Sequence, residues 1–160
     1  MEIFHPATIL PFLIEAKRRT YAASDDADQA ELAHQPSSRP ESHDLGYRQG
    51  DLFYLDTYLG GFSFIGEEAV WQAGQPVWGM NYYGTMLVEV IPEGFGAFLK
   101  QALRQVSQAA PYRGPEHYEQ DSYAYACSWS GGLKCFEGRE SISYEGQLIY
   151  TLSFHGGGIR

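Results

Sequence analysis

Apolar residues recur with two different periods along the chain, and the change of period divides it into helices and strands. An apolar stripe at helical spacing predicts an amphipathic helix over roughly residues 7–20, and a second stripe predicts another over roughly 93–108. The stretches that follow each helix are rich in aromatic and β-branched residues and are punctuated by glycine turns. They predict six strands, at about 51–59, 62–72, 76–83, 122–129, 133–144 and 147–155. Short hairpin turns are predicted at Ala73-Gly74 and at Glu145-Gly146.

The same order of features occurs twice. Residues 66–84 align without a gap with residues 138–156 at an offset of 72, and three glycines, a glutamate and a glutamine are identical. Upstream, residues 47–61 align with residues 118–132 at an offset of 71. We therefore predict an α+β fold of internally duplicated α-β-β-β units, related by a pseudo-two-fold axis, with a mainly antiparallel sheet and two helices.

The length of 160 residues favours a single domain over 1–160, with repeat 1 at about 7–84 and repeat 2 at about 93–157. Neither three-stranded unit can cover both of its own faces, so the two units must share a core. One continuous sheet with both helices on one side and two curved sheets facing each other are both compatible with the pattern. Residues 22–38 are acidic, rich in Ala and Ser, and lack a counterpart, so we predict a mobile, dispensable excursion there.

The net charge of −9 argues against nucleic acid as a partner, because a phosphate backbone repels such a chain. The basic cluster Lys17-Arg18-Arg19 ends the first predicted helix, where cations complement the helix dipole, and we interpret it in that way. The apolar start of the chain has no basic segment before it and is soon followed by Glu15. It therefore fits neither a signal peptide nor a membrane span. We expect a cytoplasmic protein with no membrane partner.

The two cysteines, Cys127 and Cys135, flank the Gly131-Gly132 pair symmetrically. This spacing predicts that they are cross-strand neighbours on either side of a turn at the two glycines. In a cytosolic protein we expect both thiols to be reduced.

Two loop segments, RPESH and RGPEH, repeat an arginine and a histidine four residues apart. They contain Arg39 with His43, and Arg113 with His117. Each pair could present a cation and an imidazole at the mouth of a ligand-binding cleft. Alternatively, the arginine fixes its loop to the sheet by binding carbonyl groups or a glutamate.

Glu68 and Glu140 form a second repeated pair. Each lies two residues after the glycine of its middle strand, on the same strand face as Val70 or Ile142. A carboxylate on an apolar face is costly unless it is paired, and a repeated arginine is a candidate partner. The functional alternative is a carboxylate that faces a ligand, or a general base with a raised pKa.

The C-terminal run LSFHGGGIR breaks the repeat, because His155 stands where the first half has Tyr83. Arg139 likewise stands in place of Glu67, so we expect the second half to be the more specialised one. Three glycines also let a backbone approach a ligand closely. The alternative is a packed imidazole near a flexible end. We predict one cleft between the repeats, with ligand-binding candidates Glu68, Glu140, Arg113, His155, Arg39 and His117.

Other chemistry has weaker support. The five histidines show no close spacing with one another or with the cysteines, so we expect no metal site and no cofactor. No nucleophile elbow or phosphate-binding loop occurs, and the catalytic residues stay unknown. The polar run Asp56-Thr57-Tyr58 interrupts an apolar strand and is a candidate cleft lining.

The runs SSRPESHDLGY, DTYLGG, GEEAVW, PVWGMNYYG, APYRGP and SFHGGGI resemble a bacterial domain family of unassigned function. The resemblance covers roughly residues 35–160 and the run FLIEAKRRTYA near the start. Members often lie C-terminal to Cro-type helix-turn-helix modules, which implies an effector-sensing role. The sequence shows no such module before the first predicted helix, so we expect any regulatory role to be indirect or lost. The resemblance supplies no catalytic residues.

These observations favour a small-molecule binding or effector-sensing domain of unknown ligand. The ligand would contact tyrosines, tryptophans and the repeated Arg and Glu residues. Two alternatives stay open: a small enzyme with Glu/His acid–base chemistry in the inter-repeat cleft, and a protein-interaction module of the toxin-neutralising kind. The chain could also form a homodimer.

Overall fold

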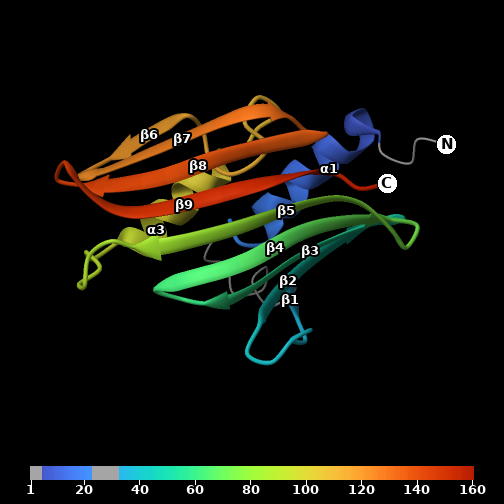
Figure 1. Cartoon of the computed structure of the whole chain (residues 1–160), viewed down its shortest axis with the longest axis horizontal. Coiled ribbons are helices and arrows are strands. Elements are labelled where there is room, and N and C mark those ends of the chain that lie inside the picture. Colours follow the sequence, from blue (N-terminus) through green and yellow to red (C-terminus); the bar gives the residue numbers. More distant parts are fainter. Residues whose placement is uncertain (1–4, 23–32) are drawn as a thin grey trace.

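The computed structural model describes residues 5–22 and 33–160, in which two helices pack against one antiparallel sheet (Figure 1). The helices are α1 (Pro6–Arg19) and α3 (Phe95–Arg104). The strands are β1 (His34–Gln35), β2 (His43–Gln49), β3 (Leu52–Gly60), β4 (Ser63–Gln72), β5 (Gln75–Met86), β6 (His117–Gln120), β7 (Tyr123–Gly132), β8 (Cys135–Tyr144) and β9 (Gln147–Gly158).

The nine strands form a single sheet in the order β1-β2-β3-β4-β5-β9-β8-β7-β6. Strands β5 and β9 meet at its centre, where Tyr82 lies opposite Phe154. Two-residue turns at 73–74 and 145–146 connect β4 to β5 and β8 to β9, and all four turn residues have positive φ. Positive φ at both positions is the geometry of the tight hairpin turn predicted at these places.

Both helices lie on the same side of the sheet (Figure 1). The structure therefore has the first of the two arrangements that the sequence left open. The buried core lies between the helices and this side of the sheet. Ile9 and Leu13 of α1 and Phe98 of α3 belong to the same apolar cluster as Trp78 and Ile142 from the sheet.

Strands β2 and β6 are the main departure from the sequence-based prediction. Their residues were expected to be irregular, yet each forms an antiparallel ladder with the strand that follows it. Each helix is thus followed by at least four strands rather than three. The apolar alternation of β2 is weak because it contains Gly46 and several polar residues, and β6 has only four residues, so neither gives a clear strand signal.

The cysteines are not cross-strand neighbours, contrary to the prediction. Cys127 pairs with Glu140, whereas Cys135 pairs with Gly132. The turn therefore falls on residues 133–134 and not on the two glycines. Both cysteines are free thiols, Cys127 buried and Cys135 exposed.

The predicted excursion at 22–38 lies largely outside the described residues, which exclude 23–32. The described residues on either side of 23–32, Ala22 and Ala33, are buried. Strand β1 follows Ala33 and pairs with β2 at the edge of the sheet. Neither helix described above is long and apolar enough to cross a membrane.

Candidate functional site

The helix-facing side of the sheet carries charged side chains at core depth. Alternation along β3 and β4 turns Asp56 and Glu68 toward the helices. The two residues lie directly opposite each other, with 3% and 0% of their surfaces exposed. Two like charges at opposite strand positions repel each other, so these carboxylates require compensation from outside the two strands.

Lys17 of α1 supplies part of that compensation. Its ammonium donates hydrogen bonds to Oε2 of Glu68 and, at 2.8 Å, to the carbonyl oxygen of Tyr112. The side chain is completely buried, and burial lowers its pKa although Glu68 opposes that shift. Lys17 lies in the last turn of α1, as the helix-dipole interpretation requires, but its buried ammonium also pairs with Glu68, which that interpretation did not include. Its neighbours Arg18 and Arg19 are exposed.

Arg113, from the loop after α3, pairs with Glu140 in the other half of the sheet. Its Nε and Nη2 donate to the two carboxylate oxygens of Glu140, each at 3.0 Å. The hydroxyls of Tyr125 and Tyr150 also donate to Glu140, at 2.7 and 2.9 Å. Glu140 thus accepts four hydrogen bonds, and the forked geometry is the strongest form of an arginine–carboxylate pair.

Asp56 has the most unusual electrostatic environment in the cluster. Its pKa is raised to about 7, first because burial disfavours the charged carboxylate and second because Glu68 is negative. The Tyr82 hydroxyl opposes this shift by donating a 2.6 Å hydrogen bond to Oδ1 of Asp56. The carboxyl group of Asp56 therefore titrates near neutral pH.

Gly66 of β4 makes room for this hydrogen bond. A Cβ atom at residue 66 would collide with the hydroxyl of Tyr82 and with Tyr58. The absence of a side chain lets the Tyr82 ring lie across β4 and reach Asp56 on β3. Gly66 therefore allows Tyr82 to reach Asp56.

Several polar atoms in this cluster have no hydrogen-bond partner within the described part of the chain. They are the hydroxyls of Tyr21 and Tyr54 and Oε1 of Glu68. Polar atoms buried without a partner are costly, and native proteins contain few of them. Their grouping next to Asp56 distinguishes this part of the core.

A cavity of about 850 Å³ opens on the helix-facing side next to the cluster. Asp56, Tyr82 and Arg113 belong to its wall. The guanidinium of Arg113 lies 5.4 Å from the ring centre of Tyr21, which also lines the cavity. The remaining wall is largely aromatic and aliphatic, with Tyr58, Phe64, Phe95, Leu99 and Leu103 among its residues.

The structure separates the predicted site residues. Three of them, Glu68, Glu140 and Arg113, lie in the buried cluster. Arg113 pairs with Glu140, which agrees with the alternative that the repeated arginine binds a glutamate. Glu68 pairs with Lys17 and not with an arginine. Arg39 is exposed and donates a 2.8 Å hydrogen bond to the Thr57 hydroxyl, so it fixes its loop to the sheet.

The two predicted histidines lie elsewhere. His117 is exposed on β6 and lines a separate hollow of about 350 Å³. His155 points to the outer side of the sheet, because Leu152 and Phe154 occupy the inward positions of β9. The prediction of one cleft shared by His155, Glu68, Glu140 and Arg113 is therefore wrong. A sheet lies between the histidine and the charged cluster.

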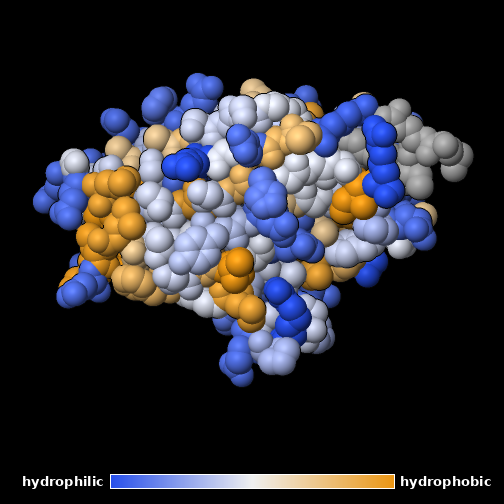
Figure 2. All heavy atoms as spheres, in the orientation of Figure 1, coloured by the Kyte–Doolittle hydropathy of each residue, from blue (hydrophilic) through white to orange (hydrophobic). Residues whose placement is uncertain are grey.

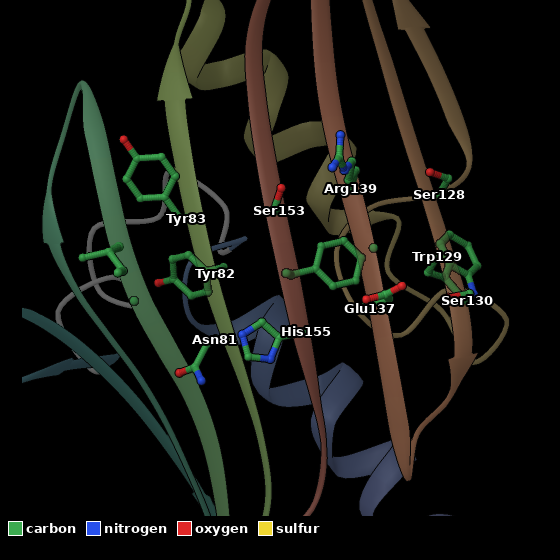
Figure 3. A pocket seen from close by; sticks show the side chains of 14 residues that line it. Asn81, Tyr82, Tyr83, Ser128, Trp129, Ser130, Glu137, Arg139, Ser153 and His155 are labelled. Carbon is green, nitrogen blue, oxygen red and sulfur yellow. The ribbon is translucent and has the colours of Figure 1, made fainter.

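His155 lies in a shallow depression of about 710 Å³ on this outer face (Figure 3). It sits between Asn81 and Glu137 in the strand register, and Arg139 and Ser153 form a neighbouring pair. Most of the outer face is pale to blue, with an apolar patch at the left end of the molecule and smaller separate ones elsewhere (Figure 2). Its charged side chains are exposed to solvent, which distinguishes them from the buried cluster behind the sheet.

Sequence reasoning overlooked Lys17 and gave Asp56 little weight. The sequence pattern did indicate that Lys17 is buried, because it continues the i, i+4 series of Ile9 and Leu13 on the buried stripe of α1. Asp56 interrupts an apolar strand, but its opposition to Glu68 depends on the strand register. The hydrogen bond from Tyr82 likewise requires three strands to be placed correctly.

Within residues 5–22 and 33–160, no three His, Cys, Asp or Glu side chains are grouped so that they could hold a metal ion. The carboxylates of the buried cluster are instead occupied by lysine, arginine and tyrosine side chains.

The model of DUF5680, a domain of unknown function, matches residues 56–159. The chain belongs to this family. The matched span includes Asp56, Glu68, Arg113 and Glu140, whereas α1 with Lys17 precedes it. Neither the curated proteins nor the solved structures contain a match to the chain. The family description assigns no activity, so the chemistry of the cavity has to support any proposed function.

Proposed function

We propose that this DUF5680 domain binds a small organic molecule in the cavity on the helix-facing side of the sheet. The observation that carries the proposal is the junction of two features. A cavity of about 850 Å³ with an aromatic wall meets a buried charged cluster, in which some polar atoms have no partner among the described residues. Ligand sites are commonly apolar cavities with a few convergent polar groups.

The two sides of the cluster support this proposal unequally. The Arg113–Glu140 pair satisfies its own hydrogen bonds and can be explained by stability alone. The hydroxyl of Tyr21 has no partner within residues 5–22 and 33–160, and each unsatisfied buried polar group costs about 1–3 kcal/mol. A ligand that bonds to Tyr21 and Asp56 would offset such costs, which gives these groups a role in binding.

A ligand screen tests the proposal. Thermal shift and ligand-observed NMR with a metabolite library should identify compounds that bind the parent protein. Leu99→Trp should fill part of the cavity and abolish their binding, since Leu99 lines it. Leu148→Trp is the matched control, because Leu148 is exposed and does not line this cavity. Equal binding to both variants would place the ligand elsewhere and refute the proposal.

The regulatory form of this proposal is effector sensing. Its support is the resemblance to domains that follow helix-turn-helix modules. A sensor must transmit binding beyond the cavity, so ligand should change hydrogen exchange in α1 or at the exposed edge strands. Protection confined to the cavity wall would leave a binding domain without a sensing role.

A second candidate function is a small enzyme that uses Asp56 as its acid–base group. The observation that favours it is a carboxyl with a pKa of about 7 in the cavity wall. A group with this pKa can both accept and donate a proton at neutral pH. Mass spectrometry of bound compounds after prolonged incubation tests this alternative. Turnover that Asp56→Asn abolishes without loss of binding would establish it.

We further infer that the fold arose by internal duplication of a helix-plus-strands unit. Irregularities of strand pairing between Val70 and Trp71 and between Ile142 and Ser143 fall at the predicted offset of 72. The positive φ angles at 73–74 and 145–146 have the same offset. Superposition of residues 47–84 on 118–156 with matching side-chain directions is the test of this inference.

A further inference from the structure

We propose that the ligand of this cavity is an organic monocation with an aromatic or branched apolar body. The inference rests on the proposed binding function and adds the charge of the ligand. Three observations carry it: the balance of buried charges on the helix-facing side, the aromatic wall, and Oε1 of Glu68, which has no hydrogen-bond partner in the described part of the chain.

The buried charges of the cluster do not balance. The carboxylates are Asp56, Glu68 and Glu140, and the cations are Lys17 and Arg113. Among residues 5–22 and 33–160, three negative groups against two positive groups leave one carboxylate of this cluster without a cation of its own. Because Lys17 bonds to Glu68 and Arg113 bonds to Glu140, the unmatched carboxylate is Asp56. Asp56 is also the one of the three carboxylates that lines the cavity.

The surroundings of Asp56 favour a cation over a neutral donor. Oε1 of Glu68, the residue opposite Asp56, accepts no hydrogen bond from residues 5–22 or 33–160. A positive group beside Asp56 would act on both carboxylates at once. The rings of Tyr21, Tyr58 and Tyr82 lie in the same cavity wall, and aromatic faces attract organic cations.

The cations of the cavity wall do not fill this place. The guanidinium of Arg113 is bound through two nitrogens to Glu140. Lys100 lines the cavity but is exposed on α3, and His43 is exposed on β2, where it stacks on Tyr58. The side-chain hydrogen bond to Asp56 within the described residues comes from Tyr82, and the cations that act on its carboxyl are Arg113 and Lys17.

Binding of a cation should release a proton. Asp56 has a pKa of about 7, and Glu68, Tyr82, Arg113 and Lys17 are the groups that act on it. A bound cation would favour the charged carboxylate and lower that pKa. At neutral pH, protein that was partly protonated at Asp56 would then lose its proton. Affinity should rise with pH up to about 7 and level off above it.

A pair of charged probes of similar size tests the sign of the charge. Benzyltrimethylammonium carries its positive charge at every pH, and phenylacetate carries a negative charge on a similar frame. Isothermal titration calorimetry at pH 8 should show binding of the ammonium and at least a tenfold weaker response to phenylacetate. Between pH 8 and pH 5 the affinity for the ammonium should fall about 100-fold, tenfold for each unit below the Asp56 pKa.

A matched pair of variants tests the residue. Asp56→Asn should reduce the affinity for benzyltrimethylammonium at least tenfold at pH 8 and remove most of its pH dependence. Asp51→Asn makes the same change in the exposed turn between β2 and β3, and its binding should equal that of the parent. Should Asp56→Asn fail to fold, the parent protein still provides a test. Titrations in two buffers with different ionisation enthalpies measure the proton released on binding.

The outcomes separate this inference from the proposed function. Tight binding of the ammonium with proton release supports both. Binding of phenylacetate or of neutral compounds in the cavity, without binding of the ammonium, overturns the charge assignment and leaves the binding function intact. Binding of the ammonium that is unaffected by pH and by Asp56→Asn also overturns the charge assignment. Failure of every library compound to bind removes both.

Discussion

Glu68 and Glu140 occupy comparable places in the two halves of the sheet but have very different environments. Both are buried, both lie on β4 or β8 next to the central strands, and each contacts a cation. Glu140 accepts hydrogen bonds from Arg113, Tyr125 and Tyr150 through both oxygens. Glu68 accepts one from Lys17, and its other oxygen has no partner in the described chain.

The residues opposite these carboxylates increase the difference. Cys127 lies opposite Glu140, and burial raises the pKa of its thiol to about 12, so it stays neutral. Asp56 lies opposite Glu68 and adds a second carboxyl. The second half is therefore electrostatically complete, and the first half has an excess of negative charge beside a cavity. We predicted greater specialisation in the second half, but these contacts make the first half the better candidate for binding.

The largest loss of stability should follow from breaking the pair between Arg113 and Glu140. Glu140→Gln removes the charge that holds the buried Arg113 and should reduce the free energy of unfolding by about 3–5 kcal/mol. Arg113 cannot lose its proton to relieve the burial, because arginine stays charged in proteins. Urea denaturation at pH 7 measures the loss. A cost below about 1 kcal/mol would contradict the role of this pair.

The next largest effect should be the pH dependence of stability, which arises from Asp56 on the Glu68 side of the cluster. Asp56 has a pKa of about 7 in the folded protein and an ordinary value of 3.8. The folded state therefore binds a proton more tightly, and its stabilising contribution is complete below about pH 4 and lost as pH rises to about 7. We expect a loss of roughly 2–4 kcal/mol over this window.

Asp56→Asn isolates this contribution. The variant should show a flatter stability profile between pH 4 and pH 7 than the parent, as measured by urea denaturation at several pH values. Asp51→Asn in the exposed turn provides the control and should keep the parent profile. Identical slopes for the parent and Asp56→Asn would show that Asp56 titrates normally.

Glu68→Gln should have a smaller effect than Glu140→Gln, with a cost of about 1–2 kcal/mol. Lys17 can lose its proton when its partner is removed, because burial already lowers its pKa. The substitution also removes the charge that raises the Asp56 pKa, which offsets part of the loss. Thermal and urea denaturation of both variants give the comparison. Equal costs would show that the two sides are equivalent.

The smallest effect is expected on the outer face. His155→Ala should change stability by no more than about 0.5 kcal/mol, because the side chain is exposed. It should also leave binding in the helix-side cavity unchanged, since His155 lies on the opposite face of the sheet from that cavity. Loss of binding in this variant would show that the outer depression is the ligand site.

The sequence by itself determined the class of fold and most of its elements. The two helices and six strands lie close to their predicted positions, and the tight turns at 73–74 and 145–146 were correctly located. These features depend on local causes, namely apolar periodicity and residues that accept positive φ. The special status of Glu68, Glu140 and Arg113 was also visible, because a carboxylate on an apolar strand face requires a partner.

The tertiary structure decided which charges meet. Lys17 reaches Glu68 across 51 positions of sequence, and Tyr82 reaches Asp56 across 26. Such pairs depend on how α1 docks and on the register of three strands, and neither is a local property. The face of the sheet on which His155 lies also depended on register, because a shift of one residue moves every side chain of a strand to the other side. The surplus carboxylate at Asp56 therefore became visible only once the sheet had been assembled.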